Sequence, residues 1–165
     1  MGIYTTNLMK IYLLAIGTKM PDWVNKGYQE YSHRMPAKCS LHLLEIPSEK
    51  RGKNSNVQSI KIKEADKLKA AIPSNCHVVA LDVKGQSWST EKLATRLQDW
   101  MMSGQDIALL VGGPDGLTPD ILQLAQEKWS LSSLTFPHPL VRVILAEQLY
   151  RAYTITENHP YHRAG

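Results

Sequence analysis

The sequence predicts an α/β fold in which a mainly parallel sheet is flanked by helices. Short apolar runs typical of buried strands alternate along the chain with longer segments whose apolar residues recur at helical spacing. Such alternation is typical of parallel sheets covered by helices on both faces. With 165 residues and 43% hydrophobic content, the chain is long enough for one domain with a substantial core.

The first half of the chain predicts two strands, each followed by a helix. "MKIYLLAIG" is the first strand, and the Pro-Asp pair after it begins a helix. One face of that helix is formed by Val24, Tyr28, Tyr31 and Met35. "SLHLLEIP" is the second strand, and the basic segment after it predicts a second helix. Its apolar positions are Val57, Ile60, Ala65, Leu68 and Ile72.

The next two strands are short and apolar, and a well-marked helix separates them. "HVVALDV" predicts the third strand and "ALLV", residues 108–111, the fourth. Between them, Ser89 or Thr90 is the expected N-cap of a helix that Gly104 closes.

The C-terminal third predicts two further helices around a last strand. Thr118 and Pro119 suit the N-cap and first position of a helix, which we expect to end near Trp129. "SLSSLTF", residues 130–136, is the candidate for a fifth strand. The longest helical pattern follows, from Leu140 to about Tyr153.

We expect one domain over residues 9–165, preceded by an extension, residues 1–8, that is either an upstream start or a cloning remnant. The apolar runs are too short to span a bilayer and the N-terminus lacks the order of a signal peptide, so a soluble, cytoplasmic protein is expected. Cys39 and Cys76 form no C-x-x-C pattern, which indicates free thiols rather than a metal ribbon or a disulfide.

The positive charge is concentrated in one segment. Residues 49–69 hold seven basic and three acidic residues, a net of +4, which equals the net charge of the whole chain. Such a patch is either a solvated helix face or a surface that binds phosphates. Its leading part, "SEKRGKNSN", reads as a polar loop whose Lys50, Arg51 and Lys53 are the candidate RNA-binding residues.

Glycines after the fourth strand suggest a ligand site. Gly112, Gly113 and Gly116 do not make G-x-G-x-x-G, and no Gly-Lys-Ser/Thr follows, so the usual phosphate-binding motifs are excluded. Ligands of parallel α/β sheets bind at the carboxyl ends of strands. Three segments fit that description, 81–82, 112–116 and 131–139, although a simple tight turn is the alternative at the glycines.

Several motifs, taken in order, resemble one family. "MKIYLLAIGTKMPDW", "KRGKN", "LDVKG", "LLVGGPDG", "LSSLTFPHPLVRVILAEQLYRA" and "NHPYHR" together make the chain similar to the SPOUT-class 23S rRNA (pseudouridine-N3)-methyltransferases over nearly all of residues 9–163. No single motif would suffice. The resemblance implies a C-terminal trefoil knot, a homodimer, and S-adenosyl-L-methionine held by the loops of the knot.

An apolar slot edged by backbone groups also suits a flat base and a sulfonium. Periodicity alone favours a core role for the leucines of this region, and the resemblance reverses that preference. The expected cofactor-binding residues are Leu81, Gly112, Gly113, Leu131, Ser132, Ser133, Leu134, Thr135 and Phe136.

The tail "NHPYHR" would ordinarily be expected to fray. The resemblance implies instead that it completes the active site, which makes Tyr161, His162 and Arg163 the candidate catalytic residues. His162 is a possible proton acceptor and Arg163 a possible stabiliser of imidate charge. A metal site at the H-x-x-H pair His159 and His162 is disfavoured. Pro160 between them breaks the helix that would point both rings in one direction. His138, between two prolines, reads as a fixed turn residue.

The resemblance further implies that the substrate is a loop pseudouridine of 23S rRNA in the assembled ribosome, splayed out and stacked on an aromatic side chain such as Tyr161. Two other classes stay open from the residues alone. One is a noncatalytic ribosome-binding factor that uses the basic patch, and the other is a small-molecule α/β enzyme whose glycine turn binds a nucleotide.

Overall fold

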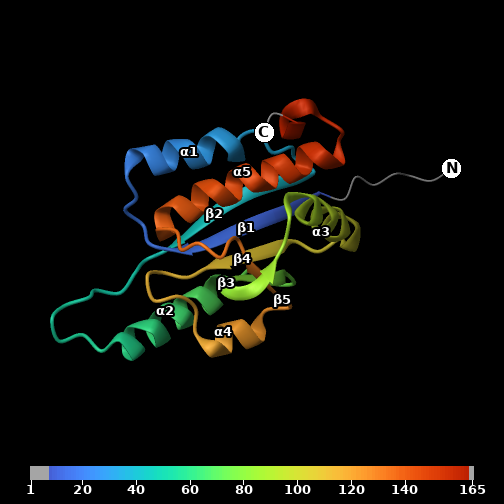
Figure 1. The fold of residues 1–165 in the computed structure, drawn as a ribbon. Coiled ribbons are helices and arrows are strands. Elements are labelled where there is room, and N and C mark those ends of the chain that lie inside the picture. Colours follow the sequence, from blue (N-terminus) through green and yellow to red (C-terminus); the bar gives the residue numbers. More distant parts are fainter. Residues whose placement is uncertain (1–7, 164–165) are drawn as a thin grey trace.

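A five-stranded parallel sheet forms the centre of the protein (Figure 1). The computed structural model describes residues 8–163, so the predicted extension lies outside the described residues apart from an exposed Leu8. The strand order is β2-β1-β4-β3-β5. The strands are β1 (Met9–Ile16), β2 (Cys39–Ile46), β3 (His77–Ser87), β4 (Ile107–Val111) and β5 (Glu127–Ser130).

Helices cover both faces of this sheet, which confirms the predicted fold class. The helices α1, α3 and α5 pack on one face, and α2 and α4 pack on the other (Figure 1). Their bounds are α1 (Asp22–Ser32), α2 (Val57–Ala71), α3 (Thr90–Ser103), α4 (Pro119–Leu124) and α5 (His138–Thr156), and a 3-10 turn, η1 (Pro160–Arg163), follows α5. Within the described residues no helix is long and apolar enough to cross a membrane.

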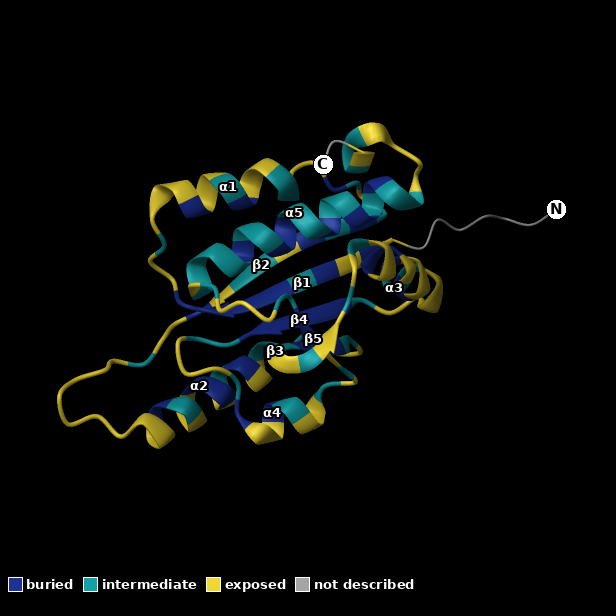
Figure 2. Cartoon of the chain, viewed as in Figure 1, coloured by how far each residue is buried: buried dark blue, intermediate teal, exposed yellow. Residues whose placement is uncertain are grey.

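The central strands β1 and β4 are buried on both sides (Figure 2). Successive residues of a strand point to opposite faces. Leu13 and Leu109 therefore join the core beneath α1, α3 and α5, whereas Leu14 and Leu110 join the core above α2 and α4. This two-sided burial explains why the strands read as continuous apolar runs rather than as alternating patterns.

The predicted caps of α3 are confirmed. The Ser89 hydroxyl accepts a hydrogen bond from the Lys92 amide, and Gly104 closes the helix in the left-handed conformation with φ +78°. Helix α1 ends at Ser32, so Met35 is buried from the following turn rather than from the helix. Cys39 is buried and Cys76 half-buried, and both are free thiols as expected.

The prediction for residues 118–136 was wrong in two places. Helix α4 begins at Thr118 and Pro119 as expected, but it ends at Leu124, and Trp129 lies on a strand. That strand is Glu127–Ser130, so residues 131–136 are a loop. Burial explains why the strand lies before residue 131. Trp129 and Ser130 are buried against β3, whereas Ser132 is half-buried and Ser133 is exposed.

Helix α5 is longer at both ends than its apolar pattern predicts. It begins at His138 because Pro139 occupies the first turn, where the missing N–H of proline has no partner to lose. It runs on to Thr156, nearly to the tail. As Figure 1 shows, α5 starts beside the carboxyl ends of the strands and finishes beside their amino ends.

Candidate functional site

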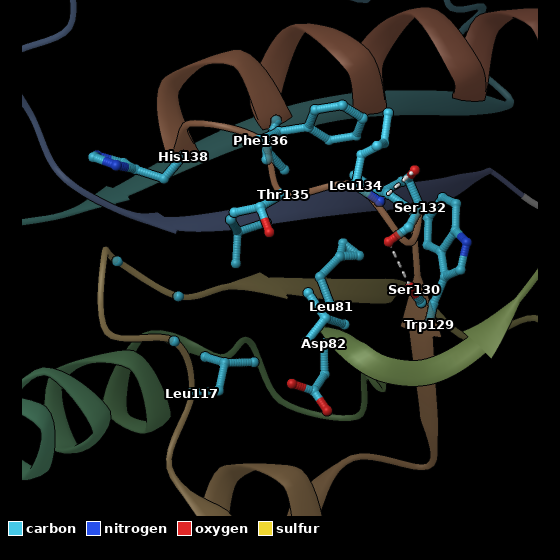
Figure 3. A pocket seen from close by; sticks show the side chains of 17 residues that line it. Leu81, Asp82, Leu117, Trp129, Ser130, Ser132, Leu134, Thr135, Phe136 and His138 are labelled. Carbon is cyan, nitrogen blue, oxygen red and sulfur yellow. Dashed lines mark hydrogen bonds between the residues drawn. The ribbon is translucent and has the colours of Figure 1, made fainter.

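A pocket opens at the carboxyl edge of the sheet, where β3, β4 and β5 end (Figure 3). We call it the strand-end pocket. Its wall combines the ends of three strands, the turn after β4, the loop after β5 and the first residues of α5. The lining residues are Leu81, Asp82, Val83, Val111, Gly112, Gly113, Gly116, Leu117, Trp129, Ser130, Leu131, Ser132, Leu134, Thr135, Phe136, His138 and Val141.

The structure brings most of the predicted cofactor residues together in this pocket. Ser133 is the exception, because it is exposed and does not line the pocket. Leu134 is 68% exposed although it is a large apolar residue. An exposed leucine on a pocket rim is available to cover an apolar ligand, which a core leucine is not.

Hydrogen bonds shape the loop 131–136. The Ser130 hydroxyl donates to the Ser132 carbonyl at 3.1 Å, and the Ser132 hydroxyl accepts from the Leu134 amide at 3.0 Å (Figure 3). In the described part of the chain, the amides of Thr135 and Phe136 donate no backbone hydrogen bond. The loop therefore presents free backbone N–H donors between apolar side chains. A ligand with uncharged hydrogen-bond acceptors on an otherwise apolar ring needs such donors.

The turn Gly112–Gly116, the glycine turn, forms the opposite wall. The Gly116 amide donates to the Gly113 carbonyl at 3.0 Å, which closes the turn. A Cβ on Gly112 would lie 2.7 Å from the Gly116 carbonyl carbon and 3.0 Å from the Leu117 amide nitrogen. Gly112 is thus required by the close approach of the chain to itself.

Sequence reasoning selected segment 81–82 but missed Val83 as a lining residue, because it expected β3 to end there. The strand continues to Ser87, but its register with β5 jumps at Trp129 from Leu81 to Gln86. Gly85 permits this bulge, since a Cβ there would lie 2.7 Å from the backbone of Lys128 and Trp129. Asp82 and Val83 lie within this bulge and line the pocket, so Asp82 gives the wall a carboxylate.

The basic loop, residues 47–56, lies beside the glycine turn. Lys50 and Lys53 are exposed, as a phosphate-binding role requires. Arg51 is instead engaged within the protein, because its Nη2 lies 3.2 Å from Glu64 Oε1 and 2.9 Å from Asp115 Oδ2. The three basic residues predicted as one group therefore differ in what they contact.

The tail lies at the far end of α5. The Tyr161 hydroxyl donates to Glu147 at 3.3 Å, the Tyr161 ring packs edge-on against Tyr150, and Arg151 lies over it. Burial, followed by the charge of Glu147, raises the pKa of Tyr161 to about 12. The phenol is therefore protonated at neutral pH, and it serves as a hydrogen-bond donor and an aromatic surface rather than as a base.

The other two tail candidates also contact their own chain. His162 Nδ1 lies 3.4 Å from the Thr154 hydroxyl, and Arg163 donates to the Asn158 side chain at 3.3 Å. Lys38, just before β2, pairs with Glu157 at 2.7 Å, which fixes this end of α5 at the amino edge of the sheet. Within one chain, the structure does not bring the tail to the strand-end pocket.

No group of three or more His, Cys, Asp or Glu side chains that could hold a metal ion occurs among residues 8–163. His138, for which the sequence predicted only a structural role, lines the strand-end pocket as the first residue of α5. Burial lowers the pKa of His138, and the positive charges of Arg142 and Arg51 lower it further against the opposing charge of Glu64. The ring is therefore neutral at pH 7.

Residues 9–162 match the family model described as "Predicted SPOUT methyltransferase". The chain belongs to the SPOUT methyltransferase family. It is therefore a methyltransferase, and S-adenosylmethionine is its methyl donor. The strand-end pocket, with apolar walls and free backbone donors, has the composition that this donor needs.

Relatives support the SPOUT assignment. The chain is 59% identical over 155 residues to "Ribosomal RNA large subunit methyltransferase H" of Thioalkalivibrio sulfidiphilus (strain HL-EbGR7), covering 94% of this chain and 99% of that protein. A probable methylase family protein from Haemophilus influenzae Rd KW20 shares the fold with a TM-score of 0.55 at 12% identity, covering 92% of this chain and 69% of that one. A probable methyltransferase from Bordetella pertussis Tohama I gives 0.54 at 12% identity, covering 89% and 95%.

Proposed function

We propose that this SPOUT enzyme methylates N3 of a pseudouridine in the 23S RNA of the large ribosomal subunit, using S-adenosylmethionine bound in the strand-end pocket. The observation that carries the proposal is the 59% identity, across nearly both whole chains, to a relative named as a ribosomal RNA large subunit methyltransferase. The identity of the base, pseudouridine, and of the methylated atom, N3, follows from the motif resemblance. A ribosomal substrate implies a cytoplasmic location.

The pocket supports binding of S-adenosylmethionine by shape and backbone rather than by charge. Leu81, Leu131, Leu134 and Phe136 offer apolar surface to a flat base, and the amides of Thr135 and Phe136 are free to bind its polar edge. When bound, the cofactor supplies an electrophilic methyl group on sulfur. The protein's main task is then to hold the acceptor nitrogen in line with that methyl group.

The active site needs two chains. Along α5, Thr154, which contacts the tail, lies 13 positions after Val141, which lines the pocket. At 1.5 Å per residue this puts His162 about 20 Å from Val141 along the helix axis, whereas Tyr161, which contacts Glu147, lies about 9 Å from it. Because its own chain holds the tail along the second half of α5, we infer that a tail that takes part in the reaction comes from a second copy of the chain, in a homodimer with Tyr161, His162 and Arg163 of the partner over the pocket. The half-buried aromatic rings of Tyr150 and Tyr153 on α5 are candidates for the dimer surface.

We infer in addition that the C-terminal chain is knotted. After the edge strand β5, residues 131–137 return across the carboxyl edge of the sheet before α5 packs on the face that holds α1 (Figure 1). This path is the one that a trefoil knot would use. It would also make the strand-end pocket a cavity enclosed by crossing loops.

Mass mapping of ribosomal RNA tests the proposal. Ribosomes from cells that lack the gene should show one pseudouridine without its methyl group, and purified protein with S-adenosylmethionine should restore the added mass at that nucleotide. Methylation of another RNA only would refute the substrate. Ribosome binding without methylation, and without saturable cofactor binding, would favour a noncatalytic ribosome factor instead.

A further inference from the structure

A second cleft lies next to the strand-end pocket and shares one residue with it. The cleft is bounded by the end of β1 and the loop after it, the basic loop, the glycine turn and the first residue of α5. Its lining residues are Ile16, Gly17, Thr18, Lys19, Met20, Pro47, Ser48, Arg51, Pro114 and His138. His138 also lines the strand-end pocket, so the imidazole stands between the two spaces.

Gly17 keeps the cleft open in front of His138. Its φ of +117° strains any other residue, and a Cβ there would lie 2.8 Å from Met20 Cε and 3.7 Å from His138 Nε2. Arg142 holds this backbone in place: it is 1% exposed, and it donates to the Gly17 carbonyl at 2.7 Å and to Glu45 at 2.6 Å. The space beside His138 Nε2 is therefore built into the fold.

The His138 ring has a free acceptor. In the described part of the chain neither ring nitrogen of His138 forms a hydrogen bond, and Figure 3 shows the ring turned away from Trp129 and Leu81, toward the outer end of the pocket. The charged groups around it are Arg142 on α5, Arg51 on the basic loop, Glu64 on α2 and Lys19 in the cleft. A neutral imidazole has one unprotonated nitrogen that can take a proton.

On the basis of the proposed function, we infer that the target base lies in this cleft and that His138 Nε2 accepts the proton of its imide nitrogen. The N3–H bond breaks and its electron pair stays on N3. That pair then bonds the methyl carbon as the carbon–sulfur bond breaks, and the sulfur keeps the electrons of that bond. The proton on His138 is later released to solvent.

The cleft has the chemistry that a pyrimidine nucleotide requires. The hydroxyls of Thr18 and Ser48 can bind the two ring carbonyls, and the exposed Lys19 ammonium can approach a flanking phosphate. An acceptor nitrogen must approach the methyl group to about 3–3.5 Å. Only a space that borders the strand-end pocket satisfies this distance, and the cleft meets the pocket at His138.

Glutamine at His138 tests the inference, because it fills similar space but cannot take up a proton. In single-turnover methylation of unmodified ribosomes, His138→Gln should be slower by about 10²–10⁴-fold. Its affinity for S-adenosylmethionine, measured by calorimetry, should stay within a factor of about three. The wild-type rate should rise with pH through an acid limb that His138→Gln lacks. His33→Gln, an exposed histidine at the end of α1, is the matched control.

The cleft itself is tested without turnover. Ring signals of His138 in the NMR spectrum of the wild-type protein with S-adenosylhomocysteine should shift when pseudouridine nucleoside is added, and Thr18→Trp should abolish this shift. An unchanged rate in His138→Gln, or a loss confined to cofactor affinity, would overturn the role of His138 as base. Wild-type protein that fails to methylate ribosomes would instead refute the proposed function.

Discussion

The guanidinium of Arg51 lies 2.9 Å from the carboxylate of Asp115 and so ties the basic loop to the glycine turn. The same guanidinium reaches Glu64, which is 5% exposed and would otherwise be a buried charge without a cationic partner. The glycine turn is a wall of the strand-end pocket. A residue selected from the sequence as a candidate RNA contact therefore supports the strand-end pocket from outside.

The exposed lysines of the basic loop should carry the RNA binding of this segment. Reversal of both charges, Lys50→Glu with Lys53→Glu, should weaken ribosome association and flatten its salt dependence, because fewer counterions are released. The slope of log affinity against log salt should fall by about 0.7–0.9 for each phosphate that the variant no longer neutralises. Cofactor affinity should not change. An unaltered slope would mark these lysines as merely solvated.

Arg51 should behave differently from its neighbours. Arg51→Ala leaves the Glu64 carboxylate buried with only the Glu49 amide as donor, which should cost about 1–2 kcal/mol of the free energy of unfolding. The loosened glycine turn should also bind S-adenosylmethionine more weakly. Urea unfolding and calorimetric titration measure the two effects, with Lys53→Ala as control. Normal cofactor affinity in Arg51→Ala would show that the ion pairs of Arg51 do not support the strand-end pocket.

Gly112 should tolerate no side chain, even the smallest. Gly112→Ala brings a Cβ into the backbone of Gly116 and Leu117, and relief of this overlap should cost about 1–3 kcal/mol. Because the turn must shift, cofactor affinity should fall as well. Gly104→Ala is the control: its backbone is left-handed and open, so about 1–2 kcal/mol of strain is expected with no change in cofactor binding. Full affinity in Gly112→Ala would contradict this expectation.

The sequence predicted those parts of the fold that local signals determine. The strand at 107–111 is apolar throughout because it is buried on both faces, and Ser89 and Gly104 mark the ends of α3 by capping chemistry that acts within a few residues. The end of α4 and the register of β5 were missed because they depend on distant partners. Trp129 is held by stacking on Trp88 and by pairing with β3, neither of which leaves a periodic pattern.

In the candidate site too, some features could be predicted from local signals and others depend on distant contacts. The carboxyl ends of parallel strands meet at one edge, so segments 81–82, 112–116 and 131–139 could be predicted to converge. Val83, which also lines the pocket, lies in a bulge that depends on Gly85 meeting β5, a contact that no local pattern reveals. The separation of the tail from the pocket follows from the full length of α5, whose first turn was not recognised.

Glu127 should make the edge strand β5 sensitive to acid. Its carboxylate accepts hydrogen bonds from Arg96, His77 and Trp100 at 2.7, 2.6 and 3.0 Å. Burial raises the pKa of this carboxyl, but these bonds outweigh it, so the pKa lies below its ordinary value. A lowered folded-state pKa adds stability above the ordinary pKa, and that stability is lost as the pH falls through the folded value.

Glu127→Gln should therefore unfold about 1–2 kcal/mol more easily than wild type at pH 7, and the difference should shrink at about pH 3. Urea unfolding at the two pH values measures it. Asp99→Asn removes an exposed partner of the same Arg96 and should change stability by less than about 0.5 kcal/mol. A difference that grows on acidification would contradict a lowered pKa for Glu127.

The tail should act in trans, and a mixed dimer can demonstrate it. Deletion of residues 161–165 removes the tail and leaves the pocket intact, whereas Thr135→Trp fills the pocket from an exposed position and leaves the tail intact. Each variant alone should fold and dimerise but fail to methylate ribosomes, and only the truncated protein should bind S-adenosylmethionine. On the proposal that the Arg163 cation acts mainly in the transition state, kcat of the truncated protein should fall far more than its cofactor affinity.

When the two variants are co-refolded, some dimers contain one chain of each kind. If the tail serves the partner's pocket, each such heterodimer holds one complete site. That site combines the pocket of the truncated chain with the tail of the Thr135→Trp chain. Random pairing makes about half of the dimers mixed, each with one of its two sites restored, so about a quarter of wild-type activity should return. If the tail served its own pocket, no mixed dimer would hold a complete site and the mixture would stay inactive. Since α5 holds His162 about 20 Å from its own pocket along the helix axis, we expect the first result.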